Sequence, residues 1–183
     1  MKQITRTLLA MVLGAVLSFL PLADAQSVSG KNVVEPAAYV SYDPVARGMS
    51  FQVAVVLKIR PGFHVNARQV TEDYLIPTDL HAEVPAGFKV AEVIYPPGRL
   101  ETFTFSKDKK LNVYTDTVTV RLPLTVLGNA PTGPQHLGMK LRYQACSTEI
   151  CLPPVTKDVE ATIHVVEGQS EAKPANAEIF AKK

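Results

Sequence analysis

The chain has 183 residues, of which 46% are hydrophobic, and a formal net charge of +2 from 19 basic and 17 acidic side chains. This length predicts one domain, and the apolar content is enough to fill a core without metals or several disulfides. The near balance of charges gives no reason to expect a nucleic acid or a strongly acidic substrate as a partner.

Residues 1–25 have the pattern of a signal peptide. Lys2 and Arg6 precede an apolar run, Leu8–Leu20, and Ala23-Asp24-Ala25 provides a small-x-small cleavage site. The apolar run is shorter than the roughly 20 residues that span a bilayer. We therefore expect cleavage after Ala25, export from the cytoplasm to an oxidising compartment, and no stable membrane insertion. Disulfides persist in that compartment.

The part of the chain expected to fold, residues 36–167, alternates apolar and polar side chains with a period of two. The clearest run is 49–59, where Phe51, Val53 and Val55 share one face. Further strands are expected at 38–42, 75–80, 88–95, 102–105, 113–124, 137–143 and 159–165, and 63–66 is expected to be a short strand or an extended loop. Short strands separated by Pro/Gly turns predict an all-β protein, an immunoglobulin-like antiparallel β-sandwich.

Two segments flank this expected sandwich. Residues 26–35 are small and polar, which predicts a flexible tether. Residues 168–183 are rich in Gly, Gln, Ser, Glu, Ala, Lys and Pro and contain little to bury, which predicts a disordered tail.

The two cysteines, Cys146 and Cys151, follow an alternating apolar run and precede Pro153-Pro154. A bond between them closes only six residues, which stabilises the fold by roughly 2 kcal/mol. The structural disulfide of immunoglobulin domains instead joins strands that are distant in the sequence. Thiol–disulfide exchange needs an accessible sulfur and a nearby second cysteine. The two prolines either hold the backbone extended beside the pair or serve as turn residues. A static disulfide and a redox couple both remain open on this evidence.

The sequence around the cysteines resembles a known family. Tyr143-Gln144-Ala145-Cys146 and Cys151-Leu152-Pro153-Pro154 are similar to the signature of the amino-terminal periplasmic domain of DsbD, a thiol:disulfide interchange protein. Residues 61–66 and 74–78 also look like segments of that family, and the resemblance covers about 33–166. It implies an immunoglobulin-like sandwich whose two cysteines carry electrons.

The resemblance also implies roles for residues and partners. Cys151 would be the nucleophile and Cys146 the resolving thiol. A membrane-embedded thiol reductase would donate electrons, and periplasmic thioredoxin-fold proteins would accept them. Because the chain has no membrane domain or thioredoxin-like domain in its sequence, we expect the donor to be a separate protein. One residue fewer separates the cysteines than in the family's best-known member.

Other side chains are expected to support the pair. The family shields its cysteines with a cap loop that contains a Phe, and Phe103 or Phe105 would take that place here. Tyr143 either packs beside the cysteines or belongs to the core, because it shares one face of the expected strand with Leu141.

Two functions other than redox exchange are also compatible with the sequence. The first is a non-enzymatic module that binds another exported protein, with the disulfide static. The weaker second is copper handling through the cysteines and Met139, since Cys and Met suit Cu(I). His136 lies close to Met139 in the sequence, but no cluster of histidines or methionines accompanies them. We therefore expect neither a metal site nor a cofactor. No nucleophile elbow supports a hydrolase.

Overall fold

The computed structural model describes residues 29–107 and 109–181, so the predicted signal peptide lies outside the described residues. Twelve strands are found in this part of the chain: β1 (Val34–Val40), β2 (Val45–Ala46), β3 (Ser50–Ile59), β4 (His64–Asn66), β5 (Asp79–Glu83), β6 (Phe88–Val90), β7 (Arg99–Thr102), β8 (Lys110–Tyr114), β9 (Thr117–Val126), β10 (Gly133–Tyr143), β11 (Ala145–Cys146) and β12 (Val155–Val166). Short 3-10 helices lie at Gly30–Asn32, Thr104–Ser106 and Gln169–Glu171, and α1 is Ala177–Phe180.

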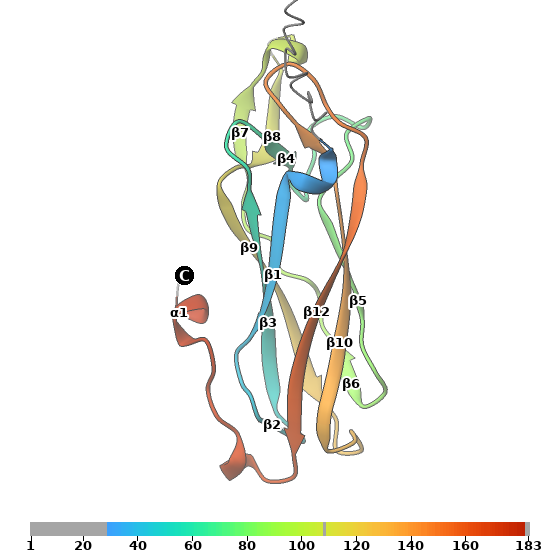
Figure 1. The fold of residues 1–183 in the computed structure, drawn as a ribbon, viewed down its shortest axis with the longest axis vertical. Coiled ribbons are helices and arrows are strands. Elements are labelled where there is room, and N and C mark those ends of the chain that lie inside the picture. The colour runs from blue at the N-terminus through green and yellow to red at the C-terminus, as the bar shows by residue number, and fades with distance from the viewer. Residues whose placement is uncertain (1–28, 108, 182–183) are drawn as a thin grey trace, which may run out of the picture.

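The strands form three four-stranded sheets. Their orders are β1-β3-β9-β6, β2-β12-β10-β5 and β11-β4-β8-β7. The first two are the layers of a sandwich, and the third lies at one end of the molecule, at the top of Figure 1. All pairings are antiparallel except that of β12 with β2. The predicted all-β, immunoglobulin-like sandwich is thus confirmed.

The core lies between the two large sheets. Phe51, Val53 and Val55 on β3 are buried, as their alternation predicts, and so are Leu137 and Leu141 on β10. Burying a side chain of this size stabilises a fold by about 1.5–3 kcal/mol. The long pairing of β10 with β12 then extends from the core to the small sheet that contains Cys146.

Four predicted strands differ from the structure. Of the run 75–80, only the last two residues lie in a strand, β5, and of the run 88–95 only Phe88–Val90 does, as β6. The run 113–124 is divided between β8 and β9, with Asp116 in a left-handed conformation (φ 58°) at the turn. Aspartate tolerates this region better than most residues because its side chain can hydrogen-bond locally. The run 102–105 is divided as well, since β7 ends at Thr102 and a 3-10 turn follows.

The fold begins earlier than the expected boundary of the tether. Gly30–Asn32 forms a 3-10 helix, and Val33 and Val34 are buried in the core. Residue 35, where the tether was expected to end, already lies within β1. The apolar pair Val33-Val34, at the start of β1, explains the difference, since a tether would leave it in water.

The expected disordered tail is instead ordered in its described part, residues 168–181. The backbone N–H of Lys173 donates to Pro44 O (3.0 Å) and that of Ala175 to Ser41 O (2.9 Å). The Asn176 amide donates to Val40 O at 2.9 Å. Composition misses this arrangement because the segment is held by backbone hydrogen bonds and buries few apolar side chains.

Within residues 29–107 and 109–181, no helix has the length and apolar character needed to cross a membrane.

Candidate functional site

A disulfide joins Cys146 and Cys151 where the chain leaves β11. The S–S distance is 2.04 Å, and the Cα atoms are 3.9 Å apart. Two backbone hydrogen bonds of 2.8 Å, from Leu152 N to Ala145 O and from Ser147 N to Ile150 O, close the loop as a tight hairpin.

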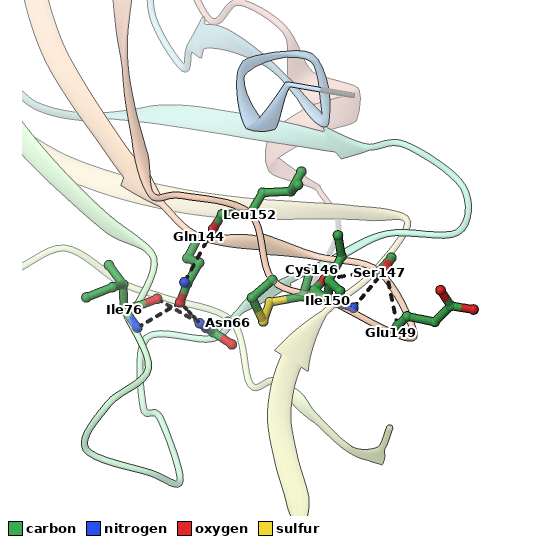
Figure 2. The surroundings of a disulfide bond; sticks show 9 residues. Asn66, Ile76, Gln144, Cys146, Ser147, Glu149, Ile150 and Leu152 are labelled. Carbon is green, nitrogen blue, oxygen red and sulfur yellow. Dashed lines mark hydrogen bonds between the residues drawn. A yellow bond between two sulfur atoms is a disulfide. The ribbon is translucent and has the colours of Figure 1, made fainter. Parts of the chain in front are cut away.

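The tip of this loop is held by the Ser147 side chain, whose Oγ accepts from the backbone N–H of Glu149 and of Ile150, each at 3.2 Å. Figure 2 shows these contacts. The loop is therefore held on both sides of the disulfide.

The two sulfur-bearing residues differ in their exposure. Cys146 is 0% exposed, whereas Cys151 is partly exposed and lines a surface pocket. Thiol–disulfide exchange requires the incoming sulfur to reach one of the two sulfurs directly. An external thiol can therefore attack at Cys151, and Cys146 then becomes the leaving sulfur.

The side-chain amide of Gln144 connects three segments around the disulfide. Its Oε1 accepts from Asn66 Nδ2 (3.2 Å) and from the backbone N–H of Ile76 (3.3 Å), and its Nε2 donates to Leu152 O (3.3 Å). Figure 2 draws all three contacts. Gln144 thus ties β4 and the loop before β5 to the residue that follows Cys151.

Three aromatic rings stack beneath the disulfide loop. His64 on β4 is the cross-strand partner of Cys146. Its ring lies 3.9 Å from that of Phe103, centroid to centroid, with 14° between the planes. Phe105 continues the stack, 5.6 Å from Phe103 and 7° from parallel to it. The rings adjoin a small apolar cluster of Leu75, Leu111 and Val113, separate from the sandwich core.

A pocket of about 370 Å³ opens beside Cys151. It is lined by Tyr74, Leu75, Phe105, Gln144, Glu149, Ile150 and Cys151. Tyr74 is 65% exposed and Ile150 is 61% exposed. Large apolar side chains left in water beside a reactive group are typical of a surface that another protein covers.

Burial also changes the protonation of the histidine beneath the loop. Removal from water lowers the pKa of His64 from 6.5 to about 4, because the charged imidazolium loses its solvation. His64 is therefore neutral at physiological pH.

The other predicted site residues occupy different positions. Phe103 lies in the ring stack and Phe105 lies in both the stack and the pocket. Pro153 and Pro154 are exposed and lead from Cys151 to β12. Tyr143 belongs to the core: it is fully buried, its hydroxyl donates to Gly30 O at 2.9 Å, and burial raises its pKa.

The residues weighed for copper lie in separate environments. Met139 is buried in the sandwich core. His136 is exposed, and its Nδ1 pairs with the Thr162 hydroxyl at 3.1 Å. Among the described residues, no group of three or more His, Cys, Asp or Glu side chains is placed to hold a metal ion.

Sequence reasoning missed the contributions of Gln144 and Asn66. Gln144 is part of the Tyr-Gln-x-Cys motif, and the only local signal for its role is that it directly follows Tyr143, whose side chain lies in the core. Its partners Asn66 and Ile76 lie about 70 residues earlier, and no local pattern connects them to it. That contact depends on the pairing of β11 with β4.

The fold and the site together define an all-β sandwich with one short-ring disulfide on the loop after a β-hairpin. The family model described as "Thiol:disulfide interchange protein DsbD, N-terminal" matches residues 31–163. The chain belongs to that family, and membership supports thiol–disulfide exchange as its chemistry.

The remaining comparisons are weak. No curated protein matches the chain. Among solved structures, AggA, the major subunit of aggregative adherence fimbriae type I from Escherichia coli, has a TM-score of 0.29 and 7% identity, over 72% of this chain and 96% of its own. AvmM, which catalyses macrocyclization in alchivemycin A biosynthesis, has a TM-score of 0.26 and 11% identity, over 73% of this chain and 91% of its own.

Proposed function

We propose that this protein is a periplasmic electron carrier that uses Cys146 and Cys151 as a redox couple. It accepts reducing equivalents from a membrane-embedded thiol reductase and passes them to thioredoxin-fold proteins. Export by the predicted signal peptide would bring it to the compartment of both partners. Family membership supports the exchange chemistry, and the unequal exposure of the two cysteines is the observation that supports directed exchange.

The proposed cycle has two halves. A donor thiolate attacks Cys151 Sγ, the Cys146–Cys151 bond breaks, and Cys146 Sγ leaves with the electron pair. The donor's second thiolate then attacks its own sulfur in the mixed disulfide, which releases the protein as a dithiol and leaves the donor oxidised. In the second half, the Cys151 thiolate attacks the acceptor's disulfide, and Cys146 resolves the mixed disulfide and re-forms the internal bond.

The pocket beside Cys151 supports docking of a partner at this sulfur. Tyr74 and Ile150 frame it with apolar surface, and Glu149 adds a carboxylate at the rim. Phe105 covers part of the same pocket, which supports the cap role that the family resemblance implies for Phe103 or Phe105.

Trapping of mixed disulfides tests this function. Reduced Cys146→Ser protein, mixed with an oxidised thioredoxin-fold protein, is expected to accumulate a covalent complex through Cys151, because the resolving sulfur is gone. Cys151→Ser is the matched control, and it is expected to trap far less because Cys146 is buried. If neither variant forms a mixed disulfide with the partner, and the wild-type disulfide has a reduction potential below about −300 mV, the disulfide is a static one.

A further inference from the structure

Two buried side-chain polar atoms lack a hydrogen-bond partner among the described residues, and both lie on β4. They are His64 Nε2 and Asn66 Oδ1. Residues 64 and 66 share one face of the strand, and that face adjoins the disulfide because His64 pairs with Cys146. An unsatisfied buried polar group costs about 1–3 kcal/mol, so its presence calls for an explanation.

The register places His64 and Cys146 directly opposite each other, with their side chains on one face of the small sheet. Residues directly opposite each other in an antiparallel pair have Cβ atoms about 4.5–5.5 Å apart, with side chains on the same face. His64 is 3% exposed, and Phe103 stacks on its ring at 3.9 Å. The ring is therefore held in position next to a sulfur that is itself excluded from water.

When the disulfide opens, the sulfur at this position requires a hydrogen-bond donor. Attack on Cys151 expels Cys146 Sγ as a thiolate, and a buried anion without a hydrogen-bond donor is strongly destabilised. A donor that is already in place and becomes satisfied only as this charge develops lowers the barrier, because it binds the transition state better than the ground state.

We propose that His64 is a catalytic residue of this couple: its Nε2–H donates a hydrogen bond to the Cys146 thiolate as that sulfur leaves. The inference rests on the proposed function, since it concerns the leaving sulfur of the same disulfide. The electron pair of the broken S–S bond stays on Cys146 Sγ, the new bond joins Cys151 Sγ to the attacking sulfur, and the imidazole keeps its proton. The low basicity of the buried ring is consistent with a neutral donor.

The rate at which dithiothreitol opens the disulfide tests this role. His64→Phe keeps a flat ring against Phe103 but removes both nitrogens. We expect this variant to be reduced 10- to 100-fold more slowly than the wild type. Its equilibrium with a glutathione buffer is expected to shift about tenfold towards the disulfide, which corresponds to about 30 mV, because the reduced state loses the same donor. Wild-type rate and equilibrium in His64→Phe would overturn the proposal.

Three variants separate this chemistry from a packing role. His136→Phe removes an exposed imidazole from β10 and is expected to leave both measurements unchanged. His64→Gln retains an N–H donor and is expected to recover part of the rate, whereas His64→Leu is not. If His64→Phe loses its cooperative thermal transition, the reduction rates of His64→Gln and His64→Leu are compared instead. Equal rates for these two variants would overturn the proposal.

The outcomes also distinguish this inference from the proposed function. If Cys146→Ser traps partners but the His64 variants react like the wild type, the redox couple stands and the role of the imidazole falls. If trapping fails but dithiothreitol still opens the disulfide more slowly in His64→Phe, the imidazole acts on the sulfur of a disulfide that does not serve as an electron carrier.

Discussion

At the scale of single residues, Gln144 determines much of the geometry around the disulfide. Its amide contacts β4, the loop before β5 and the residue after Cys151, which are far apart in the sequence. Replacing it would leave the backbone N–H of Ile76 without this acceptor, and the side-chain NH2 of Asn66 with only its bond to Ile76 O. An unsatisfied buried group costs more than the bond itself contributes.

We therefore expect Gln144→Leu to lower the free energy of unfolding by about 1–3 kcal/mol. Urea denaturation of the oxidised protein measures this change. Gln135→Leu is the matched control: this partly exposed glutamine makes one side-chain hydrogen bond, to Pro131 O at 3.3 Å, and its replacement is expected to cost less than about 0.5 kcal/mol. Equal effects of the two substitutions would mean that the Gln144 amide does not hold the loop.

At the scale of elements, the long strands follow from the sequence and the small sheet does not. β10 and β12 alternate cleanly because one face of each lies in the core, and β3 does so except at Ala54, which is buried as well. The segment after β7 also alternates, at Thr102–Phe105, yet it turns at a 3-10 helix. There, Ser106 Oγ is 2.9 Å from Phe103 O and 2.7 Å from Lys109 O. Such local side-chain hydrogen bonds compete with strand formation, and they cannot be predicted from the alternation of apolar and polar residues.

The candidate site was predictable to a similar degree. The sequence identifies Cys146 and Cys151, and the family resemblance adds Phe103 or Phe105. The burial of Cys146 and the placement of His64 beneath it come from the register between β4 and β11, a two-residue pairing of segments about 80 residues apart. A shift by one residue would move every side chain to the other face, so local patterns cannot supply this information.

The C-terminal segment is the element whose order the composition did not predict. Its contacts include backbone bonds to Ser41 and Pro44, the bond from the Asn176 amide to Val40 O, and the approach of Arg121 to the Phe180 ring, 5.6 Å from its centroid. Net contributions of about 0.5–1.5 kcal/mol per hydrogen bond are largely offset by the backbone entropy of ordering these residues.

Deleting residues 169–183 is therefore expected to lower the free energy of unfolding by only about 1–2 kcal/mol. The rate of reduction by dithiothreitol should stay within twofold of the wild type, since the described part of the segment, residues 169–181, lies against the large sheets and away from the small sheet that holds Cys146 (Figure 1). Thermal unfolding and the reduction assay measure the two effects. A tenfold change in the reduction rate would show that this segment influences the disulfide.

At the scale of the whole molecule, the sandwich provides the rigid support and the small sheet at its end provides the chemistry. β10 belongs to a large sheet and continues through Gln144 into β11, so the strand that fills the core also positions Cys146. Because His64 lies within this continuous structure, its burial contributes to the stability of the entire fold as well as to the disulfide.

That contribution makes the stability of the molecule depend on pH in a defined window. The pKa of His64 is about 4 in the folded protein and near 6.5 when unfolded. Above pH 6.5 both states are neutral and the group has no effect. Between pH 6.5 and 4 the unfolded state binds a proton that the folded state does not. The free energy of unfolding therefore decreases as the pH is lowered. The loss reaches at most about 3 kcal/mol below pH 4.

The difference in unfolding free energy between wild type and His64→Phe, measured from pH 8 to pH 4, tests this pH dependence. It isolates the contribution of His64 because both proteins contain the same carboxylates. We expect the difference to change progressively below pH 6.5 in favour of the variant, whereas His136→Phe should follow the wild type. A difference independent of pH would mean that His64 takes up its proton without leaving its buried position beneath the disulfide.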